Sequence, residues 1–232
     1  FANLLRSIAA LLQGKVPYMP LSESSFTTVH NKLLTHLVLE QNNIPMPKTY
    51  LSSSIDEAKQ LLKRVNYPIV MKFPEGTQGK GVMFADSMSS ASSMLDALSA
   101  LNQPFIVQEF LETGGEDIRA FAVGDKVVAS MKRVAQGGEK RANVHAGGKA
   151  ESILLSHEAT KIAIKTARVL GAEVCGVDIL ESHRGPLVIE ANISPGLQGI
   201  QSVSTINIAE EIARYFARKT DEVLHGKKKE EA

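Results

Sequence analysis

Asp178 and Glu190 stand in two apolar, strand-like segments near the end of the chain, and Asn192 follows Glu190 by two residues. If these segments fold as a hairpin that is symmetric about Arg184, Asp178 lies directly opposite Glu190, and Asn192 points to the same face. Two carboxylates so close together repel each other, and a divalent cation removes that repulsion. The sequence therefore predicts an all-oxygen magnesium site at Asp178, Glu190 and Asn192. The alternative is that these side chains face solvent on a half-exposed sheet.

The segment 71–84, MKFPEGTQGKGVMF, places Gly76, Gly79 and Gly81 close to Lys72. Glycines let a backbone approach a ligand closely, and a neighbouring lysine favours a phosphate. The segment matches neither the P-loop nor the dinucleotide-binding pattern, because both require a helix directly after the loop and VMFAD reads as a strand. We predict a strand–loop–strand flap over a triphosphate, with Lys72 near the inner phosphates. An ordinary β-hairpin turn is the alternative.

Two weaker signals add to this nucleotide hypothesis. Lys32, on a predicted helix, would supply a second positive charge, although a lone helical lysine is more often solvated. The segment QEFLETGGED runs from a strand end into an acidic, glycine-containing turn. Its main-chain groups can read an adenine edge, and Glu112 or Asp117 can accept hydrogen bonds from ribose hydroxyls. Many proteins contain loops of this kind, so both signals depend on the rest of the site.

A basic loop follows, with Arg133, Arg141 and Asn143 among its polar residues. Arginine suits two-point capture of a carboxylate or phosphate, whereas the alternative is a charged surface loop. The histidines outside this loop, among them His36, show no metal-ligand spacing and are expected at the surface. Cys175 lies in an apolar strand and is expected in the core rather than as a nucleophile.

Hairpins dominate the elements that must position these residues. Apolar spacing and capping residues predict helices at about 1–13, 31–43, 55–65, 88–100, 157–171 and from 206 onwards. Alternating or short apolar runs predict the intervening strands, including a hairpin that turns at Gly124–Asp125. This order favours an α+β fold with antiparallel sheets over a doubly wound parallel sheet.

Composition narrows the class of protein. The chain has 232 residues, a formal net charge of +1 and a single cysteine. The balanced charge gives no argument for binding nucleic acid or a membrane surface, and no apolar run reaches the ~20 residues of a membrane span. One cysteine excludes an internal disulfide and suits a reducing cytoplasm. The chain begins with Phe1 rather than Met, from which we expect an upstream portion to be missing.

Four motifs stand in a recognisable order: a lysine-bearing helix, a lysine–glycine-loop hairpin, a QEF hinge and a D…E-x-N hairpin. That order resembles the ATP-grasp superfamily, and the sequences of the motifs are most similar to those of its RimK-type α-L-glutamate ligases. The segments that carry the resemblance are 69–85, 117–131, 141–148 and 176–200.

The resemblance implies an ATP-grasp fold, in which two α+β subdomains with antiparallel sheets enclose the nucleotide. We expect residues 1–30 to be a remnant of, or linker from, an N-terminal subdomain. We expect the first ATP-grasp subdomain at 31–106, the second at 107–222 and a disordered charged tail at 223–232.

The resemblance also implies a role for each matching residue. The expected nucleotide-binding residues are Lys32, Lys72, Gly76, Gly79, Gly81, Gln108, Glu109, Phe110, Leu111, Asp117, Arg141 and Asn143, of which 108–111 line the adenine hinge. Arg141 and Arg133 are the expected catalytic residues, which steady an acylphosphate, and Arg119 is a further candidate for this role. Asp178, Glu190 and Asn192 are the expected magnesium ligands, with Mn2+ as a substitute. The family commonly has Arg at the position of Ala146, which leaves acceptor recognition open.

The implied function is ATP- and Mg-dependent carboxylate–amine ligation through an acylphosphate, which releases ADP and phosphate. Family analogy alone points to L-glutamate as the amine. The acceptor is a carboxylate, either of a small molecule or of a protein C-terminus. A cytoplasmic enzyme that forms a homo-oligomer is expected. The alternatives are a nucleotide-binding module without ligase activity and a phosphotransferase on the same fold.

Overall fold

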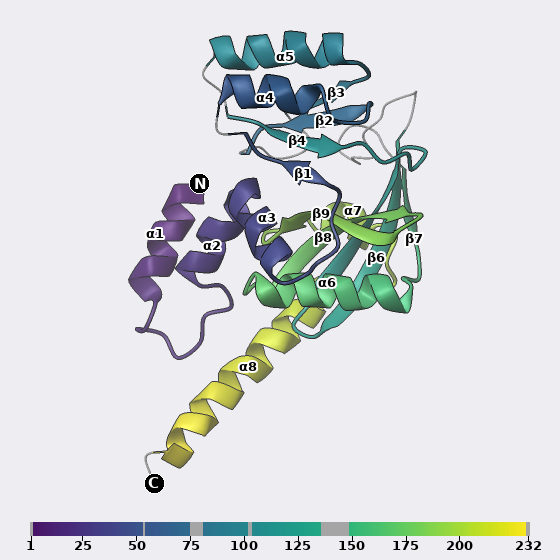
Figure 1. The fold of residues 1–232 in the computed structure, drawn as a ribbon. Helices are drawn as coiled ribbons and strands as arrows, with labels where there is room; N and C mark the ends of the chain where they lie inside the picture. Colours follow the sequence, from purple (N-terminus) through teal and green to yellow (C-terminus); the bar gives the residue numbers. More distant parts are fainter. Residues whose placement is uncertain (1, 53, 75–80, 102–103, 136–148, 231–232) are drawn as a thin grey trace.

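The computed structural model describes residues 2–52, 54–74, 81–101, 104–135 and 149–230. Two α+β units stand one above the other in Figure 1, each built on its own antiparallel sheet. Every strand pair within the two sheets is antiparallel, which confirms the fold class expected from the hairpins.

The first unit contains four strands in the order β1-β4-β2-β3. Their bounds are β1 Thr49–Tyr50, β2 Ile69–Lys72, β3 Val82–Ala85 and β4 Ile106–Glu109. The helices α4 (Ile55–Leu62) and α5 (Met88–Ala100) cover the sheet face that points away from the second unit (Figure 1). Leu62, Met71 and Leu95 are fully buried between these layers. The side chain of Ser54 caps α4 by accepting from the backbone N–H of Glu57.

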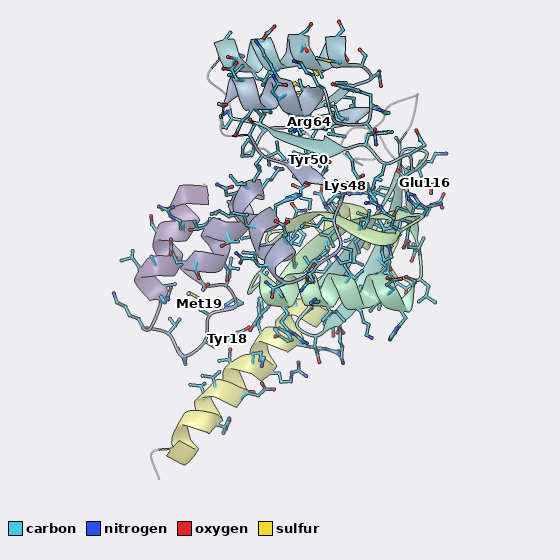
Figure 2. All side chains as sticks on the ribbon, viewed as in Figure 1. Tyr18, Met19, Lys48, Tyr50, Arg64 and Glu116 are labelled. Carbon is cyan, nitrogen blue, oxygen red and sulfur yellow. The ribbon has the colours of Figure 1, made fainter. Side chains whose placement is uncertain are left out.

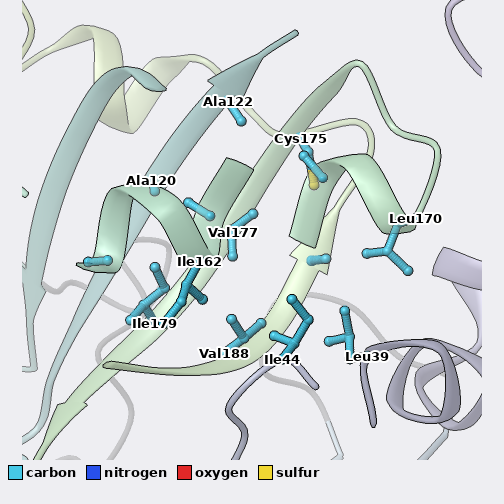
Figure 3. Close-up of a cluster of buried hydrophobic side chains, with 14 of the residues drawn as sticks. Leu39, Ile44, Ala120, Ala122, Ile162, Leu170, Cys175, Val177, Ile179 and Val188 are labelled. Carbon is cyan, nitrogen blue, oxygen red and sulfur yellow. The ribbon is translucent and has the colours of Figure 1, made fainter. Parts of the chain in front are cut away.

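The second unit contains five strands in the order β7-β6-β5-β8-β9. Their bounds are β5 Glu116–Val123, β6 Lys126–Val134, β7 Lys149–Ser152, β8 Val174–Ser182 and β9 Gly185–Asn192. Helix α6 (His157–Val169) lies along one face of this sheet (Figure 1). The core between them includes Ile162, Cys175, Val177 and Val188 (Figure 3). Cys175 is fully buried, as expected.

Two boundaries between the units differ from the prediction. Strand β4 pairs with β2, so the first sheet extends to Glu109, beyond the predicted end of the first subdomain at 106. Helix α3 (Lys32–Gln41) precedes the first sheet in sequence, but its buried Leu39 packs in the core of the second unit beside Ile44 and Val188 (Figure 3). The apolar face of α3 therefore places Lys32 next to the second sheet, because burial rather than chain order decides where a helix docks.

The ends of the chain are also more helical than predicted. The N-terminal region contains α1 (Ala2–Leu12) and α2 (Glu23–His30). Helix α2 is not among the predicted helices, although Ser22 caps it. Short helix α7 (Gln198–Gln201) is followed by α8 (Ile208–Glu230), which projects away from the body (Figure 1). Most of the segment predicted as a disordered tail is thus helical. In the part of the chain that the structure describes, no helix is both long and apolar enough to cross a membrane.

Candidate functional site

The β8–β9 hairpin places Asp178 directly opposite Glu190, as the sequence predicted. The route to that pairing is less direct than simple symmetry. The turn lies between Ser182 and Gly185, which would set the pairs one residue out of the predicted register. An irregularity next to Asp178 leaves Ile189 without a partner across the hairpin, and this extra residue restores the pairing of Asp178 with Glu190.

Asp178 is buried, with 3% of its surface exposed, and two arginines hold its carboxylate. Arg119 donates two hydrogen bonds of 2.7 Å to it, one to each oxygen. An Nη2 atom of Arg133 lies 3.0 Å from Oδ2 of the same carboxylate. Burial alone would raise the pKa of Asp178, but the charges of Arg133 and Arg119 outweigh it and hold the pKa below its usual value.

Arg133 is shared between Asp178 and Asp117. Its guanidinium donates to both oxygens of Asp117, at 2.5 and 2.8 Å, and its side chain is only 6% exposed. Burial nevertheless raises the pKa of Asp117 to about 6, because the attraction of Arg133 offsets only part of the desolvation. Both residues are therefore committed to a buried ion-pair network, which orients Asp178.

Glu190 is the less neutralised member of the carboxylate pair. Burial and the charge of Asp178 raise its pKa. Nζ of Lys32 lies 3.8 Å from Oε1 of Glu190. On the same strand, Nδ2 of Asn192 is buried and has no hydrogen-bond partner among the residues that the structure describes. Amide oxygen and nitrogen are interchangeable by rotation, and the rotated form would offer an oxygen at that place.

This donor set fits a divalent cation. A carboxylate offers about four lone-pair sites, and the arginines occupy three of those on Asp178. A cation beside Glu190 would favour its ionised form, and Asn192 would gain a partner. Among the residues that the structure describes, no three His, Cys, Asp or Glu side chains gather as a metal site. Only two carboxylates meet here, and the third donor is an amide.

Lys72 reaches the same region from the end of β2. Its Nζ donates a 2.6 Å hydrogen bond to Oε1 of Gln108 on the neighbouring strand β4. Burial lowers the pKa of Lys72 to about 8, although the charges of Glu190 and Asp178 favour the protonated form. Lys72 and Lys32 thus bring two positive charges to the carboxylate pair.

His36 is not the isolated surface residue that the sequence suggested. It is partly buried and lies within hydrogen-bond distance of Thr49, at 2.9 Å, and of the Gln108 amide nitrogen, at 3.3 Å. Gln108 is 3% exposed, and its amide also donates to Thr49 at 2.8 Å. Its side chain is therefore engaged with Lys72 and Thr49 beside the predicted hinge. Spacing offered one signal that was missed, since His36 lies one helical turn after Lys32 on α3.

The predicted hinge, residues 108–111, lies where the two units meet. Glu109 accepts from the backbone N–H of Lys48 at 2.7 Å and also from the guanidinium of Arg184 in the β8–β9 turn. Lys48 lies on the segment that joins the units (Figure 2). The rings of Phe110 and Phe84 meet edge to face with centroids 5.8 Å apart. Leu111 follows Phe110 directly in the chain. The Arg184–Glu109 pair was not predicted.

The structure describes only part of the predicted flap and basic loop. Gly81 has a φ of +77°, and a side chain there would collide with the ring of Phe73. The carbonyl of Pro74 accepts from the backbone N–H of Lys32 at 3.1 Å, which ties the base of the flap to α3. Gly76, Gly79, Arg141, Asn143 and Ala146 lie outside the described residues.

Residues 29–216 match the family model of the RimK-like ATP-grasp domain. A protein named probable alpha-L-glutamate ligase from Legionella pneumophila strain Corby is 47% identical over 184 residues, which cover 78% of this chain and 61% of the relative. Probable alpha-L-glutamate ligase 1 of Hahella chejuensis is 44% identical over 206 residues, covering 88% and 68%. The chain therefore spans about three fifths of the length of the Legionella relative.

Two solved structures show the fold at lower sequence identity. The ATP-grasp ligase PsnB, solved with a precursor variant, Mg and ADP, is 18% identical with a TM-score of 0.74 over 94% of this chain and 67% of that one. D-alanine–D-alanine ligase from Bacillus anthracis is 19% identical with a TM-score of 0.64, covering 90% and 72%. These similarities confirm the predicted ATP-grasp fold.

Proposed function

The chain belongs to the RimK-like ATP-grasp family, and we propose that it forms the nucleotide- and metal-binding part of an ATP-dependent carboxylate–amine ligase. The observation that carries the proposal is the pairing of Asp178 with Glu190 beside Asn192, with Lys32 and Lys72 directed at the same region. Carboxylate and amide oxygens suit Mg2+, with Mn2+ as a substitute, and the lysines suit the phosphates of ATP.

The proposed reaction has two steps. The acceptor carboxylate attacks the γ-phosphate of ATP, which gives an acylphosphate and ADP. An amine then displaces phosphate and forms an amide. No protein nucleophile is needed, which agrees with a fully buried Cys175.

The residues of the chain act by binding the charged phosphates and by orienting the proposed metal ligands. Lys32 and Lys72 would contact the phosphates, while the buried Arg133 and Arg119 hold Asp178 in a fixed orientation. Asp178, Glu190 and Asn192 would hold magnesium, which would supply positive charge to offset the charge of the leaving group. Arg133 contacts Asp178 at 3.0 Å, which supports a catalytic part for Arg133 in positioning the proposed metal ligand. Arg141 and Asn143 remain proposed contacts of the γ-phosphate. Gly76, Gly79 and Gly81 remain proposed parts of a flap that excludes water.

L-glutamate is the proposed amine substrate, because two curated relatives carry the name alpha-L-glutamate ligase. The proposed acceptor is a small molecule or a protein C-terminus with a free carboxylate. We also propose a cytoplasmic homo-oligomer as the working form.

A screen of ADP release tests this function. Glutamate is paired with candidate carboxylate acceptors, and the Glu190→Gln protein serves as the blank. The proposal predicts ADP release that requires both substrates, with a product heavier than the acceptor by one glutamate residue. A stable phosphoester would instead establish a phosphotransferase, and ATP binding without turnover for any pair would favour a binding module.

A further inference from the structure

We propose that His36 positions the ammonium group of Lys72 through Gln108 and thereby raises affinity for the nucleotide's phosphates; this rests on the assignment of Lys72 to those phosphates. His36 acts on Lys72 indirectly, through the amide of Gln108 and the hydroxyl of Thr49.

The direction of the hydrogen bonds follows from Lys72. An ammonium group can only donate, so the atom of Gln108 that lies 2.6 Å from Nζ must be the amide oxygen. The amide nitrogen of Gln108 then points the other way, 2.8 Å from Oγ1 of Thr49 and 3.3 Å from Nε2 of His36. One orientation of a single amide thus satisfies partners on both sides.

His36 meets this amide as a hydrogen-bond acceptor. The NH2 group of Gln108 can only donate, so the ring nitrogen that faces it is best satisfied when it carries no proton. The hydroxyl of Thr49 can share its hydrogen between this nitrogen and the carbonyl of Pro47. The proton then sits on Nδ1, which lies 3.2 Å from the carbonyl oxygen of Lys32 and can donate to it. Burial, followed by the nearby charge of Lys72, lowers the pKa of His36 and so favours this neutral form.

The orientation of the Gln108 amide therefore depends on the residue at position 36. With an acceptor at position 36, turning the amide over would place its oxygen against Nε2 of His36 and its nitrogen against Lys72. Both contacts would then be unfavourable. Without that acceptor, the turned orientation of the Gln108 amide costs less free energy and is populated more often. Lys72 then lacks its hydrogen-bond partner for part of the time. A partly buried ammonium without its partner is held less firmly for a phosphate.

Binding measurements on four single variants test this proposal. Titration calorimetry with the non-hydrolysable ATP analogue AMPPNP and Mg2+, and separately with adenosine, gives affinities for wild type, His36→Phe, His36→Gln, Thr49→Val and Lys72→Met. Loss of one neutral hydrogen bond should weaken AMPPNP binding about fivefold in His36→Phe. Thr49→Val should act in the same direction. Adenosine, which lacks phosphates, should bind as it does to wild type.

Two further readouts separate positioning from damage to the fold. His36→Gln keeps an acceptor and should restore AMPPNP affinity close to the wild-type value. In a Lys72→Met background, His36→Phe should add nothing, because the group that it positions is gone. An equal loss of AMPPNP and adenosine binding, or an undiminished effect in the Lys72→Met background, would overturn the inference.

The failure of this inference can be told from the failure of the proposed function. If Lys72→Met weakens AMPPNP binding and neither His36→Phe nor Thr49→Val does, only the positioning role of His36 falls. If Lys72→Met leaves AMPPNP affinity unchanged, the assignment of Lys72 to the phosphates falls and the inference falls with it.

Discussion

Arg119 donates two hydrogen bonds of 2.7 Å to the carboxylate of Asp178. Asp178 is also one of the proposed metal ligands. These hydrogen bonds neutralise a buried carboxylate. They leave room for a metal at the remaining lone pair, since Arg133 supplies only one further contact. The pair thus links the stability of the second sheet to the geometry of the proposed site.

Replacing Arg119 by alanine should therefore destabilise the protein. Removal of one partner from a buried ion pair typically costs about 3 kcal/mol, because a charge is left uncompensated. Chemical denaturation should show that loss in the free energy of unfolding. Arg168→Ala, a change at an exposed arginine of α6, is the matched control and should have little effect. Equal stability of the two variants would contradict the assigned role of Arg119.

Lys72 should make stability depend on pH in a defined direction. Its pKa in the folded protein is about 8, below the value of an unfolded lysine, so the unfolded chain binds more protons between these two pKa values. Stability relative to Lys72→Met should rise as pH increases from about 8 to about 10. Melting temperatures of both proteins at several pH values measure this difference. A difference that stays flat would show that Lys72 is not desolvated.

Gly81 and Gly14 form a natural comparison for the flap. Their φ angles are +77° and +76°, but only at Gly81 would a side chain meet the ring of Phe73, whereas Gly14 has open space. Alanine at either position carries backbone strain of about 1 kcal/mol. Gly81→Ala should cost more in the free energy of unfolding than Gly14→Ala, and should also weaken ATP binding. Matching losses at the two sites would mean that Phe73 moves away freely.

The Arg184–Glu109 pair should contribute little to stability. Its side chains are 33% and 24% exposed, so solvent screens the interaction, and exposed pairs contribute about 0–1 kcal/mol. Its expected effect is on hinge motion, because it joins the β8–β9 turn to β4. Arg184→Gln should speed release of ADP in stopped-flow experiments while changing the melting temperature only slightly. An unchanged rate of ADP release in Arg184→Gln would show that the Arg184–Glu109 pair does not restrain this motion.

The sequence predicted the parts of this molecule that depend on local patterns. The hairpins follow from apolar periodicity and the caps from polar residues next to it. The pairing of Asp178 with Glu190 was also predicted, although it depends on the extra residue Ile189, which the sequence did not predict. The docking of α3 on the second core did not, because Leu39 meets residues far along the chain. His36 was missed for the same reason, since its partners Thr49 and Gln108 are 13 and 72 residues away. Buried polar networks of this kind depend on tertiary contacts that no local pattern encodes.

The most direct test of the account is the effect of Mg2+ on ATP-analogue binding in Glu190→Gln. Calorimetry with AMPPNP, in the presence and absence of Mg2+, would compare wild type, Glu190→Gln and the control Glu181→Gln, which changes an exposed residue of β8. We predict that Mg2+ strengthens binding in wild type and Glu181→Gln, and that Glu190→Gln loses this enhancement while its fold stays intact. An unchanged magnesium dependence in Glu190→Gln would contradict the proposed site.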